Sequence, residues 1–437
     1  MMPFEMSQNT VILGSGIIGL STAYYLSQGL QPSTIHLIDP SPTLFSSASG
    51  YAGGFLARDW FSAACAELGE LSFEEHRKLA EEYNGGEKWG WGWSTSFSFV
   101  AGQKQSANGK ATRGDDWLRG DGSRAVESNG ASRNLVADED GAVSRPRWLR
   151  TAGGDTLEVI SGDETTAQVY AFPLQISYIR SDPLRLCKFL LETCISRGVQ
   201  LHHPAQGISI HQDMRNEISS IRVLDTATQI ESDIPCTKIL IAAGAWSPSV
   251  FSTLFPQSKL KLPIRSLAGH SLVVRAPEYW NADDEGKGCH AVFASNEDEF
   301  SPEIFSRKAG EIYVAGLNSS SIPLPELATG SKIEDESIRK LKKVTKQMLK
   351  VDVDNELDVV RKGLCFRPVT NKGVPILARI PDTDLGGVNT RGAEDGGVWL
   401  AAGHGPWGIS QSLGTGKVMA EMMQGKPTSA DVSRLGL

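Results

Sequence analysis

The sequence lacks several features that would assign it to whole classes of protein. Its 437 residues contain no run of roughly 18 apolar residues, so we expect no integral membrane contact. The six cysteines show no Cys-x-x-Cys spacing and the eight histidines form no helical metal pair, which argues against a disulfide framework and a metal site. A net charge of −8 argues against a nucleic-acid or anionic-membrane partner, because both call for a basic surface.

Targeting signals are also missing. The first ten residues, MMPFEMSQNT, have no basic stretch followed by an apolar core, and the last five, SRLGL, are not the peroxisomal Ser-Lys-Leu address. We therefore expect a cytoplasmic protein. At about 150 residues per domain, the length suits two domains or one large domain with insertions.

A dinucleotide-binding fingerprint is present near the amino terminus. Residues 10–39 read as an apolar strand, a Gly14-x-Gly16-x-x-Gly19 turn, a helix and a second strand that ends at Asp39. Such glycines permit a tight turn, close approach of a pyrophosphate and close packing of helix on strand. The helix N-terminus favours phosphate, and Asp39 is spaced to accept from ribose hydroxyls.

The residues that follow help to choose between NAD and FAD, which the fingerprint alone leaves open. A nicotinamide dehydrogenase normally continues with alternating strands and helices. Here residues 47–54 are instead mostly small, which would let the backbone approach a planar ligand closely. A helix of about 24 residues is expected to open near Asp59. Regularity is then lost from Gly85 to about Gln168, although KWGWGWSTSFSFV alternates like a strand, so its aromatic residues favour sheet packing over a cavity lining.

Ordered patterns return after residue 170. Ser181-Asp182-Pro183 predicts the start of a helix that ends at Gly198, and apolar strands follow, one of them ending in Ala242-Ala243-Gly244. Residues 261–316 alternate like an antiparallel sheet. The stretch Ser331–Glu334 reads as a capping box before a charged helix.

The carboxyl-terminal stretch AAGHGPWGISQSLGTGK, residues 401–417, carries five glycines ahead of a helical run. Gly416-Lys417 suggests a phosphate-binding P-loop. The motif, however, needs a glycine where Gln411 stands and Ser or Thr where Val418 stands, so we reject it.

These segments together resemble the FAD-dependent oxidoreductases of the D-amino acid oxidase and glycine oxidase superfamily. The resemblance runs along nearly the whole chain, and the AGGFLARDW and GHGPWGI forms are most similar to a fungal branch of oxidoreductases, some of them linked to endosomal sorting. It implies an α/β fold with a discontinuous Rossmann-type FAD-binding domain, at residues 8–84, 170–258 and 361–437. A substrate or cap insertion at 85–169 and an antiparallel-sheet substrate domain at 259–360 complete the expected organisation.

The resemblance also implies where FAD binds. The glycine-rich carboxyl loop would lie near the isoalloxazine ring, where backbone N–H groups stabilise the charge that develops on reduction. The cofactor-binding residues that we predict are Gly14, Ser15, Gly16, Ile17, Ile18, Gly19, Asp39, Pro40, Ser47, Ser49, Gly50, Ala52, Gly53, Gly54, Phe55, Gly207, Ala243, Gly244, Trp246, Cys365, Arg367, Gly403, Gly405, Trp407, Gly408 and Ile409.

Four residues are catalytic candidates. Arg367, in an Arg-Pro pair, matches the arginine that clamps the substrate carboxylate in the family; a structural salt bridge is the competing interpretation. His404 matches a flavin-side histidine of the sarcosine oxidase group, and His270 and Arg58 are positional candidates. Cys365 stands where that group attaches its flavin covalently, which leaves covalent and noncovalent FAD both open.

One difference from the sarcosine oxidases argues that this chain does not act on sarcosine or its analogues. They carry a substrate-binding lysine in the carboxyl loop, where Trp407 stands in this chain. The resemblance therefore predicts oxidation of the C–N bond of an amino acid or related small amine, by hydride transfer to flavin N5. An NAD(P) dehydrogenase, and an FAD-binding protein with a trafficking or scaffold role and possible endosomal association, are the alternatives.

Overall fold

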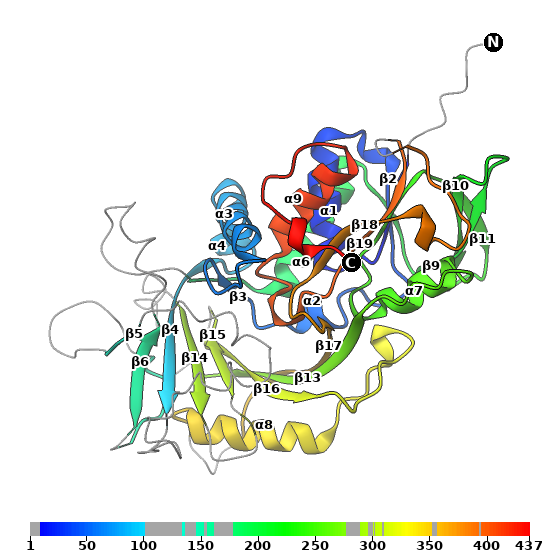
Figure 1. The fold of residues 1–437 in the computed structure, drawn as a ribbon. Coiled ribbons are helices and arrows are strands. Elements are labelled where there is room, and N and C mark those ends of the chain that lie inside the picture. The colour runs from blue at the N-terminus through cyan, green and yellow to red at the C-terminus, as the bar shows by residue number, and fades with distance from the viewer. Residues whose placement is uncertain are drawn as a thin grey trace.

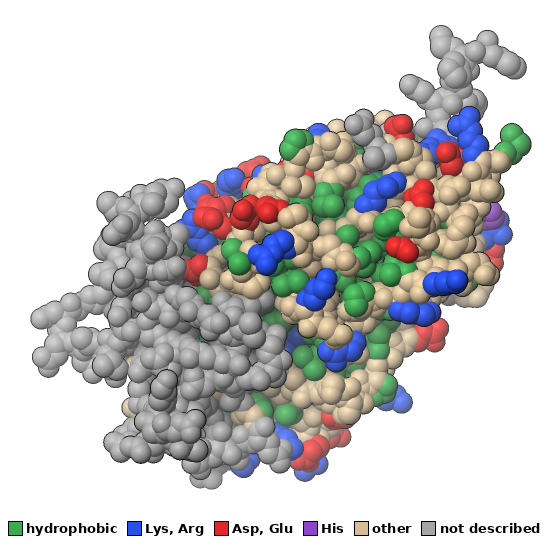
Figure 2. All heavy atoms as spheres, viewed as in Figure 1, with side chains coloured by type: hydrophobic (Ala, Val, Ile, Leu, Met, Phe, Trp, Pro, Cys, Tyr) green, Lys and Arg blue, Asp and Glu red, His purple; other side chains and the backbone are tan. Residues whose placement is uncertain are grey.

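A computed structural model describes residues 9–100, 133–135, 146–152, 155–160, 178–276, 289–295, 300, 302–307, 310–351, 356–392 and 395–437. Within these ranges no helix combines the length and the apolar character needed to cross a bilayer. All six cysteines are buried, and none of them is in a disulfide bond. Figure 2 shows acidic and basic side chains interspersed over one face of the molecule.

A six-stranded sheet forms the first half of the fold. Its strands lie in the order β18 (Ile376–Ile380), β19 (Gly397–Ala402), β12 (Lys238–Ile241), β1 (Thr10–Leu13), β2 (Ile35–Ile38) and β8 (Gln200–His202). All neighbours pair in parallel except β18 with β19. Sequence-distant segments therefore meet in one sheet, as the discontinuous Rossmann-type prediction requires.

Both faces of this sheet are covered, and its central strands β1, β12 and β19 are buried along their whole length. Ile12 packs in a core with the helices α1 (Ile17–Gly29), α3 (Ala66–Tyr83), α6 (Pro183–Arg197) and α9 (Ser412–Met423). Its neighbours Val11 and Leu13 point the other way, because successive strand residues alternate between faces. They pack under α7 (Ser247–Leu254) and the small sheet of β9 (Ala205–Gln212), β10 (Ile218–Asp225) and β11 (Glu231–Pro235).

A ten-stranded, largely antiparallel sheet forms the second half (Figure 1). Its main path runs through β17 (Val359–Thr370), β13 (Ile264–Arg275), β16 (Glu311–Ser319), β15 (Glu303–Ser306), β14 (Cys289–Ser295), β4 (Gly92–Val100), β6 (Thr156–Ile160) and β5 (Arg133–Leu135). The strand β7 (Tyr178–Arg180) pairs with both β4 and β3 (Phe55–Ala57). The short helices α2 (Ala48–Tyr51) and α4 (Gly85–Lys88) complete the elements near it.

The helix α8 (Asp335–Met348) covers the far face of this sheet (Figure 1). Its residues Ile338, Leu341, Val344 and Met348 pack against that face. The opposite face carries Phe293, Phe305 and Tyr313 into the core shared with the six-stranded half. That face therefore meets the predicted cofactor domain, while the domain boundaries at residues 85, 170, 259 and 361 stay predictions.

Several local predictions can be compared directly with the structure. The helix start at Asp182 is confirmed, because its carboxylate accepts the N–H groups of Leu184 and Arg185, and Gly198 ends the helix with a φ of +107°. Of the stretch KWGWGWSTSFSFV, the last nine residues, Gly92–Val100, form β4, with Phe97 and Phe99 buried in the core under α8. The remainder of the predicted insertion lies mostly outside the described residues.

Two helix starts were predicted wrongly. The helix expected near Asp59 begins only at Ala66, after turns in which the Cys65 N–H donates to the Ser62 carbonyl. The capping box at Ser331 does not form, because the Ser331 hydroxyl donates to the Ala328 carbonyl and α8 begins at Asp335. Acidic residues in the first turn of each helix favour these later starts by complementing the helix dipole.

Candidate FAD and substrate site

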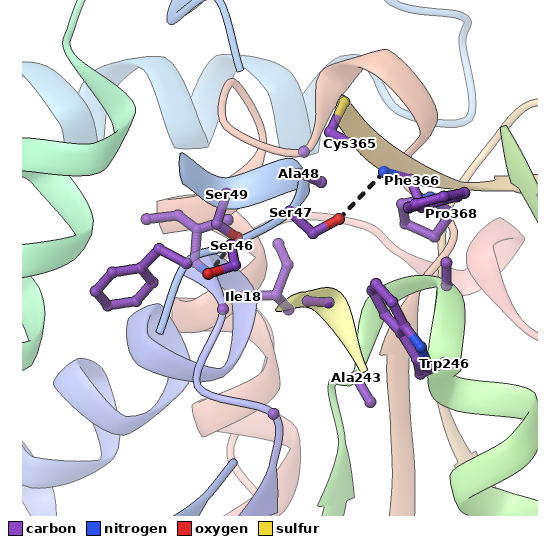
Figure 3. A pocket seen from close by; sticks show the side chains of 18 of the residues that line it. Ile18, Ser46, Ser47, Ala48, Ser49, Ala243, Trp246, Cys365, Phe366 and Pro368 are labelled. Carbon is purple, nitrogen blue, oxygen red and sulfur yellow. Dashed lines mark hydrogen bonds between the residues drawn. The ribbon is translucent and has the colours of Figure 1, made fainter. Parts of the chain in front are cut away.

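A cavity of about 570 Å³ is lined by elements of both halves of the fold. This volume falls within the range of sites that hold cofactors and small molecules. Figure 3 shows part of it, with Ser46, Ser47, Ala48 and Ser49 on one side and Ala243 and Trp246 on another. The lining runs from the β1–α1 turn to the loop that precedes α9.

The β1–α1 turn has the geometry of a phosphate-binding turn. Gly14 has a φ of +108°, and a Cβ added there would lie 2.6 Å from the Ala242 carbonyl oxygen. A Cβ on Gly19 would meet the Gly14 carbonyl oxygen at 2.0 Å, so this glycine allows α1 to pack closely on the turn. The N–H groups of the first helical turn have no partner within the helix, and such a helix N-terminus favours an anion, although the N–H of Ile17 donates to the Ser49 hydroxyl.

Asp39 directly follows β2, beside this turn, and lines the cavity. Its carboxylate accepts the N–H groups of Ser15 and Ser41, both at 3.0 Å. Burial raises the pKa of this carboxyl, and the two N–H donors oppose that rise. Each carboxylate oxygen keeps a further acceptor site, which is what contact with ribose hydroxyls requires.

The small residues after β2 form one wall. The Ser49 hydroxyl accepts the Ile17 N–H at 3.0 Å, and the Ser47 hydroxyl accepts the Phe366 N–H at 3.1 Å, the contact drawn in Figure 3. Ser47 therefore ties α2 to β17 across the cavity. A Cβ on Gly53 would approach the Phe305 ring to 2.6 Å, so only glycine lets the backbone of this wall pack so closely against that ring.

A further wall follows β12 and includes residues that the sequence did not indicate. Trp246 donates from its indole N–H to the Pro325 carbonyl at 2.7 Å. This bond holds the segment Leu324–Ala328 against the cavity, together with Ser249, Val250 and Thr253 of α7. No motif marks these residues, because their place depends on a tertiary contact between distant parts of the chain.

Arg367, Cys365, Tyr313 and Glu303 line the part of the cavity formed by the antiparallel sheet. The Arg367 Nη1 donates to the Asn318 side-chain oxygen at 2.7 Å. Burial raises the pKa of the Cys365 thiol, and the neighbouring Arg367, which also hydrogen-bonds to it, opposes that rise. Burial likewise raises the pKa of Tyr313 to about 12, so both groups stay protonated at neutral pH.

The carboxyl loop closes the cavity with His404, Gly405, Pro406, Gly408 and Ile409. His404 is buried, and its Nε2 lies 3.0 Å from the Thr415 hydroxyl. Burial lowers its pKa to about 3, so the ring is neutral. Its Nδ1 is buried without a hydrogen-bond partner in the described part of the chain, which leaves a polar atom for a ligand to satisfy.

Most of the predicted cofactor residues line this cavity together. Seven predicted site residues lie outside its lining: Ser15, Gly19, Gly50, Gly403, Trp407, His270 and Arg58. Trp407 packs edge-on against Trp60 and Phe61 in the core. His270 accepts the Glu334 N–H at 3.2 Å, and Arg58 forms a salt bridge with Glu70. The structure therefore gives these three side chains contacts away from the cavity.

The donor set and the shape of the cavity fit FAD. One end offers a helix N-terminus for phosphate and a carboxylate for ribose, and glycines keep the backbone open between the ends. The other end adds a cationic side chain and a buried histidine nitrogen beside the carboxyl loop. Among the described residues, no group of three or more His, Cys, Asp or Glu could hold a metal ion.

Comparison with known proteins identifies relatives along the whole chain. Putative oxidoreductase C1F5.03c of Schizosaccharomyces pombe is 26% identical, covering 98% of this chain and 97% of its own. Putative oxidoreductase TDA3 of Saccharomyces cerevisiae is 24% identical, covering 99% and 94%. The solved glycine oxidase of Geobacillus kaustophilus superposes with a TM-score of 0.69 at 18% identity, covering 98% of both chains.

The structure of L-amino acid deaminase from Proteus myxofaciens superposes with a TM-score of 0.68 at 15% identity, covering 99% of this chain and 94% of its own. At such identities the likeness concerns the fold. The match to a sequence family is broader: residues 9–422 match the family described as DAO, FAD dependent oxidoreductase. The resemblance expected from the sequence is confirmed, and the chain belongs to the DAO family of FAD-dependent oxidoreductases, with FAD as its cofactor.

Proposed function

We propose that this protein oxidises the C–N bond of an amino acid or related small amine. The observation that carries the proposal is the position of Arg367, whose guanidinium lines the cavity on the antiparallel sheet. A planar guanidinium binds a carboxylate through two parallel hydrogen bonds and so fixes both its position and its orientation. The bond to Asn318 holds the guanidinium in place for that role.

FAD, when bound, would supply the redox chemistry by accepting a hydride from the carbon that bears the amine. Loss of this hydride from a neutral amine would leave an iminium ion, which becomes an imine when its nitrogen releases a proton to water, and water hydrolyses the product. The protein's own residues orient the substrate and exclude water from the cavity. Arg367 anchors the carboxylate, while Tyr313 and Phe366 supply apolar surface on the same sheet. Orientation of this kind removes much of the entropic cost of the reaction.

Relatives with named activities support the choice of substrate class. A glycine oxidase of Bacillus licheniformis is 24% identical, and it covers 97% of this chain. A D-amino acid dehydrogenase of Paramagnetospirillum magneticum is 25% identical over 49% of this chain. The trafficking role gains no support from the relatives named above, and no feature of the cavity favours it.

Anaerobic reduction of the bound flavin tests the proposal. The protein is mixed with a panel of L- and D-amino acids, glycine and N-substituted glycines, and bleaching of the visible flavin band is followed. We expect at least one amino acid to bleach the flavin, and Arg367→Ala to slow bleaching by at least about tenfold, because charged hydrogen bonds contribute about 1.5–3 kcal/mol.

Arg265→Ala is the matched control. Arg265 lies on the same sheet and also donates to an asparagine side-chain oxygen, that of Asn371 at 3.2 Å, but it does not line the cavity. We expect the control to bleach at the rate of the unchanged protein. Equal rates in Arg367→Ala and Arg265→Ala, or no bleaching by any amino acid, would refute the proposal.

A further inference from the structure

Two arginines lie behind the cavity wall that is made by the small residues after β2. Arg307 directly follows β15, and its Nη2 donates to the Ala52 carbonyl at 3.1 Å. Arg361 of β17 donates from its Nη1 to the Gly50 carbonyl at 3.0 Å. Ala52 lines the cavity, whereas neither arginine does. The two guanidinium groups are therefore separated from a ligand in the cavity by the backbone of this wall.

This part of the wall belongs to the end of the cavity that the antiparallel sheet forms. A Cβ added to Gly53 would lie 2.6 Å from the Phe305 ring and 3.0 Å from the Tyr313 ring. The guanidinium carbon of Arg307 lies 5.3 Å from the centre of the same Tyr313 ring, which lines the cavity. The phosphate-binding turn and Asp39 mark the other end, so the isoalloxazine ring of FAD would bind on this side.

Neither positive charge is fully paired within the described part of the chain. Arg307 is only 8% exposed, and its Nε, like the Nη2 of Arg361, has no hydrogen-bond partner there. The Asp182 carboxylate lies 3.9 Å from the Nη1 of Arg307, but it also accepts two N–H groups at the start of α6. Burial lowers the pKa of Arg307, although an arginine keeps its proton in proteins. An incompletely paired buried cation stabilises negative charge nearby.

We infer that Arg307 and Arg361 favour the reduced form of the flavin through their positive charges. The isoalloxazine ring gains negative charge on reduction, and charged groups near the ring alter its electronic properties. Two unit charges about 10 Å apart, at an effective dielectric constant of about 20, change an equilibrium by at least about tenfold. The inference concerns the cofactor and does not depend on which substrate the site takes.

The competing role is structural, in which the two arginines only hold the carbonyl groups of the wall in place. Substitutions separate the two roles. Arg307→Gln and Arg361→Gln remove the charge but leave an N–H donor, whereas Arg307→Lys keeps the charge and changes the geometry of the hydrogen bond. If the charge matters, lysine is tolerated and glutamine is not. If only the geometry matters, lysine is as harmful as glutamine.

Arg197, the last residue of α6, offers a matched control. Its Nη1 donates to the Tyr24 carbonyl at 3.1 Å, and its guanidinium carbon lies 4.4 Å from the centre of the Tyr24 ring. Neither residue lines the cavity. Arg197→Gln therefore removes an arginine that makes the same two kinds of contact as Arg307 but does not lie behind the cavity wall.

The experiment equilibrates the FAD-loaded protein anaerobically with a reference dye of known potential and measures the ratio of reduced to oxidised flavin by absorbance. The dye supplies the two electrons and water supplies the proton, so no amine substrate is needed. We expect Arg307→Gln and Arg361→Gln each to lower the ratio at least about tenfold at a fixed dye potential, which corresponds to about 30 mV for a two-electron couple. Arg307→Lys and Arg197→Gln should stay within about threefold of the unchanged protein.

Two results would overturn the inference. One is an unchanged ratio in both glutamine variants, and the other is an equal loss in Arg307→Lys and Arg307→Gln. Arg361 is less buried than Arg307, so Arg361→Gln on its own decides the question if Arg307→Gln fails to fold or loses FAD. Neither result bears on the proposed function, because that proposal concerns the substrate and is tested by bleaching with amino acids.

Discussion

Acid sensitivity of the buried histidines gives a prediction that depends only on the fold. His76 of α3 is buried, and its Nε2 donates to the Ile409 carbonyl at 2.9 Å, which joins α3 to the carboxyl loop. Burial lowers its pKa to about 4. In the unfolded chain a histidine titrates near pH 6.5. The unfolded state therefore binds the proton more readily between those two values.

The sign and the size of the effect follow from this difference. Because the folded pKa is lowered, the stabilising contribution is complete above about pH 6.5 and declines as pH falls toward 4. Lowering the pH from 7 to 5 therefore reduces the free energy of unfolding by about 2 kcal/mol for each such histidine. His404, whose pKa burial lowers to about 3, adds a similar loss.

The perturbation is His76→Gln, because an amide can still donate to Ile409 but does not titrate. Urea unfolding of the FAD-saturated protein at pH 7 and pH 5, followed by tryptophan fluorescence, gives the change in stability with pH. We expect that change to be smaller by about 2 kcal/mol in His76→Gln than in the unchanged protein. His211, whose side chain is 41% exposed, provides the control His211→Gln. An identical pH dependence in His76→Gln and the unchanged protein would refute the reasoning.

Two further predictions concern the cofactor. Gly14→Ala should purify with little FAD, because the added Cβ would lie 2.6 Å from the Ala242 carbonyl oxygen and force the turn to shift. Gly90 also has a positive φ, but a Cβ there would meet no atom within 4 Å, so Gly90→Ala should retain FAD. Equal FAD content in the two variants would contradict this prediction. Burial raises the pKa of the Cys365 thiol, and a protonated thiol is a poor nucleophile, so we expect noncovalent FAD. After acid precipitation the flavin colour should then stay in the supernatant, for the unchanged protein and for Cys365→Ser, and colour in the pellet would show a covalent link.

The sequence predicted best what depends on local spacing. The turn from Gly14 to Gly19 and the acid at Asp39 lie within one βαβ unit, so their geometry follows from about thirty neighbouring residues. Helix α6 was similarly predictable, because Asp182 and Gly198 carry its signals at either end. The assignment of the sheet-bound Arg367 came from family resemblance rather than from any local pattern.

The sequence predicted least where strands from distant segments meet. Glu303 and Tyr313 enter the cavity because β15 and β16 pair antiparallel, and short alternating strands do not specify their neighbours. One signal was present: Glu303 is a charged residue in a strand whose other residues are buried. Arg58 and His270 were proposed from position alone. Arg58 instead forms a salt bridge with Glu70, and His270 accepts the N–H of Glu334. No sequence motif reveals either contact.

A crystal structure of the FAD-loaded protein soaked with acetate tests the central claim most directly. The account predicts density for the acetate carboxylate on the guanidinium of Arg367, held by two hydrogen bonds and facing the flavin ring. Acetate bound elsewhere in the cavity, with Arg367 still bonded only to Asn318 and Cys365, would contradict it.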